Sequence, residues 1–120
     1  MSHLVTVQTQ IRDPVAIASA CRRLGLVEPI RGTAQLFSAE ATGLILQLPG
    51  WTYPVVIATD TGTVNYDNYG GSWGDLAQLD SFMQAYAVEK ARLEARKKGF
   101  TVSEQTLEDG SIRLQIAEGF

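Results

Sequence analysis

Alternating apolar and polar side chains in residues 3–11 predict a β-strand, because successive side chains of a strand face opposite sides of a sheet. A helix should follow, since Asp13 can cap its first amides and Pro14 suits its first turn. Apolar residues recur at helical spacing around Cys21, and Gly25 suits a left-handed helix end. The chain therefore begins with a strand, a tight turn and a short amphipathic helix.

The middle of the chain is rich in strand-forming residues interrupted by turn residues. Glycine and proline break the apolar pattern at three places, each typical of a turn. Between these turns the pattern predicts four strands, at residues 35–41, 44–48, 53–59 and 63–66.

Residues 76–98 carry an apolar stripe at helical spacing behind Asp75, which predicts a long helix with an N-cap. Gly99 should end this helix, and an Asp-Gly turn should join residues 100–107 and 111–117 into a hairpin. The order β-α-β-β-β-β-α-β-β predicts an α+β fold, with two helices on a single, mostly antiparallel sheet of about six or seven strands.

Composition is typical of a soluble single domain. The chain has 120 residues, of which 45% are hydrophobic, so we expect one domain over residues 1–120. No apolar run approaches the roughly 20 residues of a membrane span. Residues 1–4 lack the features of a signal peptide, so we expect a cytoplasmic protein that does not enter a membrane. The single cysteine excludes a disulfide framework. A pI near 5.0 argues against nucleic acid as a partner.

The sequence contains no convincing catalytic set. His3 is the only histidine and is a candidate polar group of a pocket. The alternative is a half-buried imidazole that hydrogen-bonds to the backbone. Cys21 lies on the buried stripe of its helix and should behave as a small apolar residue, unless folding brings it beside His3. We therefore expect no catalytic residues, no cofactor and no metal.

Residues 65–75 combine glycines and small polar residues with three aromatic side chains, Tyr66, Tyr69 and Trp73. Aromatic residues are typical of contact surfaces, because each joins a large apolar face to a polar group. They equally suit a plug at the end of a small core. The segment lacks the lysine of a phosphate-binding loop and the closing glutamate of a calcium loop.

A second aromatic pair, Trp51 and Tyr53, follows a Pro-Gly turn. If this pair meets residues 65–75 in the fold, the two segments would line one aromatic groove. The candidate binding surface therefore comprises Trp51, Tyr53, Tyr66, Asp67, Tyr69 and Trp73.

Three segments resemble a known family. They are MSHLVTVQTQIRD at residues 1–13, QAYA at residues 84–87, and KGFTV at residues 98–102 followed by EDGSIRL at residues 108–114. These segments are similar to small proteins first described as a hypothetical open reading frame of algal plastids, a domain of unknown function with bacterial relatives. The central strands differ from the plastid type, and residues 66–73 resemble a bacterial subgroup.

The resemblance implies a protein of the cytosol or, in plastid relatives, of the stroma. It supplies no established activity and no catalytic residues. Bacterial members are often encoded near an AAA-class ATPase, which implies an accessory role beside such an ATPase or a small subunit.

Three functional hypotheses follow. The first is an accessory or adaptor protein that binds a protein partner near residues 65–75. The alternative is a small-ligand-binding domain or weak enzyme, with a pocket between that loop and the sheet and with His3, Asp67 or Tyr69 as polar groups. The third is a homo-oligomer formed through an uncovered sheet edge.

Overall fold

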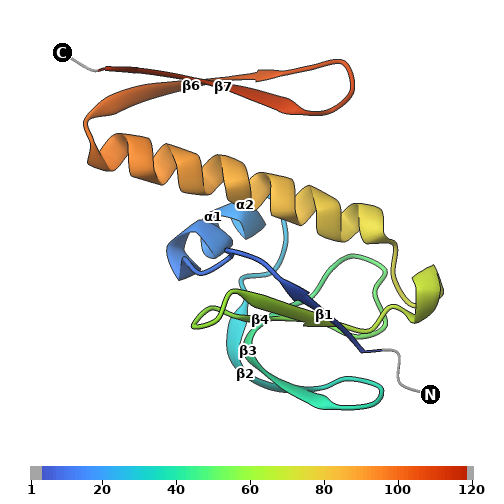
Figure 1. The fold of residues 1–120 in the computed structure, drawn as a ribbon. Coiled ribbons are helices and arrows are strands. Elements are labelled where there is room, and N and C mark those ends of the chain that lie inside the picture. The colour runs from blue at the N-terminus through green and yellow to red at the C-terminus, as the bar shows by residue number, and fades with distance from the viewer. Residues whose placement is uncertain (1–3, 119–120) are drawn as a thin grey trace.

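The computed structural model describes residues 4–118 as two β-layers separated by helices (Figure 1). The elements follow the predicted succession of strands and helices, with one short 3-10 helix added. The predicted strand at residues 35–41 is wrong, because residues 36–39 form the turn between strands at residues 30–35 and 40–46. They are β1 (Val5–Gln8), α1 (Pro14–Leu24), β2 (Ile30–Gln35), β3 (Glu40–Leu46), β4 (Val55–Ala58), β5 (Thr63–Tyr66), the 3-10 helix η1 (Tyr69–Gly71), α2 (Leu76–Lys97), β6 (Phe100–Thr106) and β7 (Ile112–Glu118).

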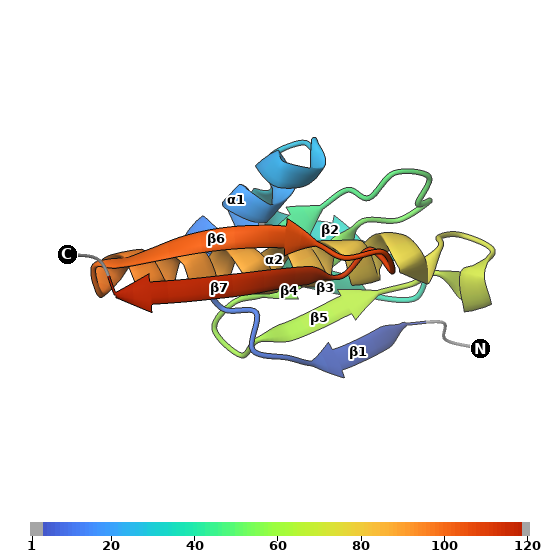
Figure 2. The ribbon, with the colours of Figure 1, turned by 90° about the horizontal axis from the view of Figure 1, so that it is seen from above.

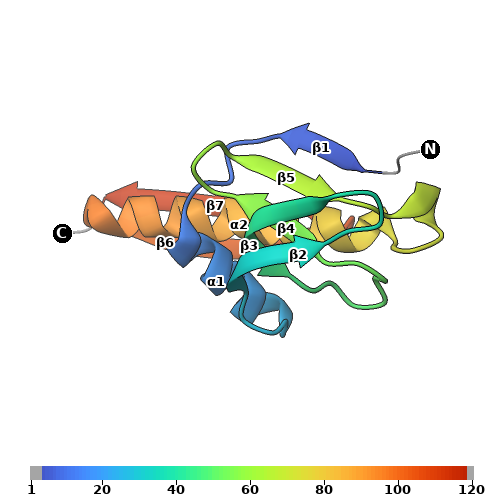
Figure 3. The ribbon, with the colours of Figure 1, turned by 90° about the horizontal axis from the view of Figure 1, so that it is seen from below.

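The first five strands form one antiparallel sheet in the order β1-β5-β4-β3-β2, as Figure 3 shows from below. The prediction of a single sheet of about six or seven strands is wrong, because β6 and β7 pair only with each other. Gly99, with a φ of 78°, reverses the chain directly after α2. The hairpin then runs back along the side of α2 that faces away from the large sheet (Figures 1 and 2).

Side-chain alternation explains why the β6–β7 hairpin lies on α2. Val102 and Leu114 are half-buried on one face of the ribbon, whereas Ser103, Arg113 and Gln115 are exposed on the other. A ribbon with one apolar face needs a surface to cover. The helix α2 supplies that surface and thus separates the two β-layers.

The helix α1 begins and ends as the sequence predicts. The side chain of Asp13 accepts hydrogen bonds from the amides of Val15 and Ala16, and Gly25 closes the helix in the left-handed conformation, with a φ of 71°. The buried stripe of α1 packs against α2, and both helices cover one face of the large sheet. This interface holds the main core, whose largest fully buried members include Phe82, Ile17, Leu46, Leu48 and Ile57.

A second buried patch lies on the opposite face of the large sheet. Val55 and Ile57 belong to the main core, so Val56 points the other way, yet it is fully buried. Leu36, at the tip of the β2–β3 hairpin, is also buried. Figure 1 shows this hairpin running beneath β4. We attribute the second patch to that crossing, which brings the hairpin tip toward the loops at the far end of the sheet.

No helix within residues 4–118 has both the length and the apolar character that crossing a bilayer requires.

Candidate functional site

Three chain connections meet at one end of the large sheet: the β2–β3 turn, the β3–β4 loop and the β5–α2 connection. The amide of Thr52 donates a hydrogen bond to the carbonyl of Trp73 over 2.8 Å. The ring of Phe37 lies 5.0 Å from that of Trp73, measured between centroids. The two aromatic segments, which the sequence left as possible neighbours, therefore lie together in the structure.

Four aromatic side chains form a surface that we call the aromatic patch: Phe37, Tyr53, Tyr69 and Trp73. Trp73 is at its centre, with Tyr53 packed edge-on at 5.4 Å and Tyr69 stacked at 4.7 Å. Phe37 is 50% exposed and Tyr69 46% exposed. Rings at these separations contact one another directly, so the patch presents a continuous apolar surface instead of an open cage around a ligand.

The backbone holds Tyr69 in a strained conformation. Its φ is 46°, and among the described residues it is the only non-glycine residue with a positive φ. Gly70 and Gly71 follow, also with positive φ. The left-handed region costs a side-chain-bearing residue about 1 kcal/mol or more and is typical of functional sites. In this protein the left-handed residue, Tyr69, is the one whose ring stacks on Trp73.

Trp51 and Tyr66 belong to the core and not to the surface, contrary to their inclusion in the candidate binding surface. Their rings meet edge-on at 5.7 Å, and both side chains are buried. The indole Nε1 of Trp51 donates to the carbonyl of Asp75 over 3.2 Å. Gly74 lies under this indole, because a Cβ on Gly74 would stand 2.3 Å from Trp51 Cδ2. The alternative prediction for residues 65–75, an inward plug, therefore holds for Tyr66.

Asp67 is completely buried and cannot serve as an exposed contact residue. Neither of its carboxylate oxygens has a hydrogen-bond partner among residues 4–118. Alternation along the chain from β5 directs Asp67 away from Tyr66, toward the face that the β2–β3 hairpin crosses. A carboxylate in this position lowers stability, because burial removes its hydration without replacing it.

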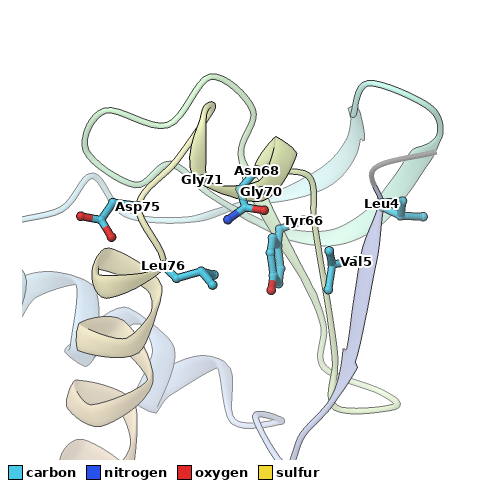
Figure 4. Close-up of a pocket in the computed structure, with 8 residues that line it drawn as sticks. All are labelled: Leu4, Val5, Tyr66, Asn68, Gly70, Gly71, Asp75 and Leu76. Carbon is cyan, nitrogen blue, oxygen red and sulfur yellow. The ribbon is translucent and has the colours of Figure 1, made fainter. Parts of the chain in front are cut away.

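A cavity of about 780 Å³ opens beside the aromatic patch (Figure 4). Figure 4 shows the ring of Tyr66 between the side chains of Leu76 and Val5. Burial, assisted by the nearby charge of Asp80, raises the pKa of the Tyr66 hydroxyl, which therefore stays protonated at neutral pH. The cavity is lined by Leu4, Val5, Tyr66, Asn68, Gly70, Gly71, Asp75 and Leu76.

Two further candidates from the sequence lie elsewhere. His3 falls outside the described residues. Cys21 is buried on α1, where burial and, to a smaller extent, Glu28 raise the pKa of its thiol to about 11. Reactive thiols have lowered pKa values. Cys21 is therefore a protonated core residue at neutral pH.

The sequence prediction missed Phe37 and Asn68. Phe37 had no local signal, because the predicted strand at residues 35–41 placed it inside a strand, whereas the structure places it in the turn between β2 and β3. Asn68 had none, since its side chain enters the cavity wall only because Nδ2 bonds to the carbonyl of Gly74 over 3.3 Å.

Comparisons of the chain with protein-family models, with curated proteins and with solved structures find no match.

Proposed function

We propose that this chain is a non-enzymatic accessory or adaptor protein that binds another protein through the aromatic patch. The observation that carries the proposal is the packing of Trp73 against rings from three separate connections, at a place where Phe37 and Tyr69 stay about half exposed. Aromatic anchors of this kind dominate the binding energy of many protein interfaces. The strained backbone at Tyr69 supports the same function, since strain concentrates at binding sites.

The partner that we propose is an AAA-class ATPase or a small subunit beside it. The support is the family resemblance of residues 1–13, 84–87 and 98–114. A chain of 120 residues with no convincing catalytic set suits an accessory role. We place this binding in the cytoplasm.

The test is affinity capture from the native host with three variants. Tyr69→Asn removes the ring and suits the left-handed backbone, and Phe37→Ser removes the second exposed ring. Val27→Ser is the control, because Val27 is 75% exposed and lies outside the patch. We expect both patch variants to lose a partner that wild type and Val27→Ser capture, while all variants unfold cooperatively. Equal capture by all variants would contradict the proposal.

A second candidate function is the binding of a small ligand, with or without weak catalysis, and the cavity beside Tyr66 favours it. A volume near 780 Å³ is within the usual range for ligand pockets. A thermal-shift screen of metabolites would detect such a ligand. Stabilisation that Tyr66→Phe abolishes would support this function, and a screen in which no compound stabilises the chain would contradict it.

A further inference from the structure

Charge is unevenly distributed along the chain. No lysine, arginine or histidine occurs from residue 32 to residue 89, and all 10 lysines and arginines lie in residues 12–31 and 90–113. The intervening segment includes the whole aromatic patch and most of the cavity wall. Its acidic residues are Glu40, Asp60, Asp67, Asp75, Asp80 and Glu89.

The carboxylates near the cavity have no cationic partner within residues 4–118. The ion pairs of this part of the chain involve the cap of α1, the C-terminal half of α1, the second half of α2 and β6. Asp75, which lines the cavity, and Asp80, whose charge acts on Tyr66, take part in none of them. Uncompensated charges of one sign raise the local concentration of a ligand of the opposite sign.

One hydroxyl group in the cavity wall makes no hydrogen bond with a described residue. Tyr66 is only 7% exposed, and its hydroxyl makes no hydrogen bond within the described chain. Figure 4 shows the Tyr66 ring between Leu76 and Val5, with its hydroxyl at the end of the ring that points away from the Asn68 amide. Asn68 is 5% exposed and directs a donor to Gly74, which leaves Oδ1 as an acceptor.

Anions are poorly matched to this cavity. The amides of Gly71, Ser72 and Trp73 already donate to carbonyls of Asn68 and Tyr69. The start of α2 would attract an anion, but the carboxylate of Asp75 already accepts from the amide of Ala77 there, over 3.0 Å. The polar groups that remain in the cavity wall are therefore mainly hydrogen-bond acceptors, and the nearby carboxylates add negative charge.

We propose that the cavity receives a cationic side chain, a guanidinium or an ammonium, from the partner segment that lies on the aromatic patch. The inference rests on the proposed function and adds the chemistry of the bound segment. The cation would donate to the Tyr66 hydroxyl, and the charges of Asp75 and Asp80 would attract it. Tyr69 and Gly70 are adjacent in sequence, so one bound segment can reach both the patch and the cavity.

The test is a titration of the ¹⁵N-labelled full chain with capped arginine (N-acetyl-arginine amide), followed by amide chemical shifts. Capped citrulline has nearly the same shape without the charge, and capped glutamate reverses the charge. We expect saturable shifts at Asn68, Gly70, Gly71 and Leu76, with millimolar affinity for capped arginine and at least about fivefold weaker binding of capped citrulline. High salt should weaken the binding.

Tyr66→Phe removes the hydroxyl and keeps the ring, so it should weaken capped arginine about fivefold. Tyr53→Phe is the matched control outside the cavity and should leave the affinity unchanged. The inference is overturned if capped citrulline or capped glutamate binds as well as capped arginine, if no saturable shifts occur at the cavity, or if Tyr66→Phe binds like wild type.

This experiment separates the inference from the proposed function. Tyr69→Asn removes an aromatic patch ring but no cavity side chain, so it should lose partner capture and still bind capped arginine. If Tyr69→Asn keeps partner capture while capped arginine binds the cavity, the proposed function fails and the cavity chemistry stands.

Discussion

Gly74 is the residue on which the buried half of the site depends most directly. The indole of Trp51 occupies the space where any larger side chain at position 74 would stand. The same indole bonds to the carbonyl of Asp75 and packs on Tyr66. The absence of a side chain at Gly74 therefore allows the β3–β4 loop to pack directly against the start of α2.

We predict that Gly74→Ala destabilises the fold by about 2 kcal/mol, because overpacking a buried contact forces the indole or the backbone to move. Urea unfolding, followed by tryptophan fluorescence, measures the change. Ser72→Ala is the control on the same loop, where the side chain is exposed, and should change stability by less than about 0.5 kcal/mol. A Gly74→Ala variant as stable as wild type would show that the indole does not fix this corner.

Asp67 is the second decisive residue, and its effect has the opposite sign. We predict that Asp67→Asn raises the free energy of unfolding by about 1 kcal/mol, because an unpaired buried carboxylate is more costly than a neutral amide of the same shape. Asp60→Asn, on the exposed β4–β5 turn, is the control. Loss of stability in Asp67→Asn would mean that the carboxylate has a role that its contacts do not reveal.

Among the elements, α1 and α2 are joined by Asp13 and Lys90, whose charged atoms lie 3.0 Å apart. Burial works to raise the pKa of Asp13, but hydrogen bonds from Lys90, Ala16 and Val15 outweigh it and hold the pKa below its ordinary value of 3.8. A lowered pKa in the folded state means that this stabilisation is complete above the unfolded pKa and is lost as the pH falls through the folded one.

Two variants separate the charge from the cap. Asp13→Asn keeps a capping side chain, so at pH 7 it should cost about 0.5 kcal/mol, as expected for a half-exposed ion pair. Asp13→Ala should cost about 1 kcal/mol more, because the cap is lost as well. Unfolding at pH 7 and pH 3 measures both, and the deficit of Asp13→Asn should shrink at the lower pH. A deficit of equal size at both values would refute the ion-pair account.

The β6–β7 hairpin is fastened to the helices by Glu104. Its carboxylate pairs with Arg23 at 2.7 Å and with Arg92 at 2.6 Å, and Arg23 also pairs with Glu89. The hydrogen bond from Arg23 is the main reason that the pKa of Glu104 lies below its ordinary value of 4.5. Because the pKa of Glu104 is lowered in the folded state, its ion pairs stabilise the hairpin fully above pH 4.5 and less as the pH falls below 4.5.

We predict that Glu104→Gln detaches the hairpin without unfolding the large sheet. At pH 7 the amides of β6 and β7 should exchange with deuterium about fivefold faster, which corresponds to about 1 kcal/mol for a partly exposed network. Amides of β4, in the large sheet, serve as the internal control. Unchanged exchange in the hairpin would show that apolar contacts alone hold it.

Sequence reasoning recovered the elements whose patterns are local. The period of α2, the cap at Asp13 and the Asp-Gly turn of the last hairpin each depend on residues close together in the chain. The layering was not accessible in this way. Whether a half-apolar ribbon such as Val102 and Leu114 covers a helix or extends a sheet depends on which partner folding brings near, and the alternation is the same in both cases.

The candidate site was partly predictable for the same reason. Composition drew attention to Tyr53, Tyr69 and Trp73, and the structure gathers them. The burial of Trp51 and Tyr66 depends on Gly74, and the inclusion of Phe37 depends on the path of the β2–β3 hairpin. Both are long-range facts that a single sequence does not contain.

At the scale of the whole molecule, the ends differ in chemistry. Most basic residues and the ion pairs of the described residues lie along the α1–α2–β6 side, whereas the aromatic patch and the cavity share the opposite end of the sheet. A molecule of 56 × 32 × 23 Å can present this end to a partner while the hairpin layer stays outside the contact. The central claim is that this end is the binding surface.

Site-specific photo-crosslinking tests that claim most directly. A photoreactive phenylalanine derivative replaces Phe37 in the patch or, as the control, Val27 on the turn between α1 and β2, and the full chain is irradiated in its native host. We predict a discrete crosslinked polypeptide from position 37 that is missing from position 27 and that disappears with Tyr69→Asn. Crosslinks that are equal at both positions, or absent at position 37, would contradict the account.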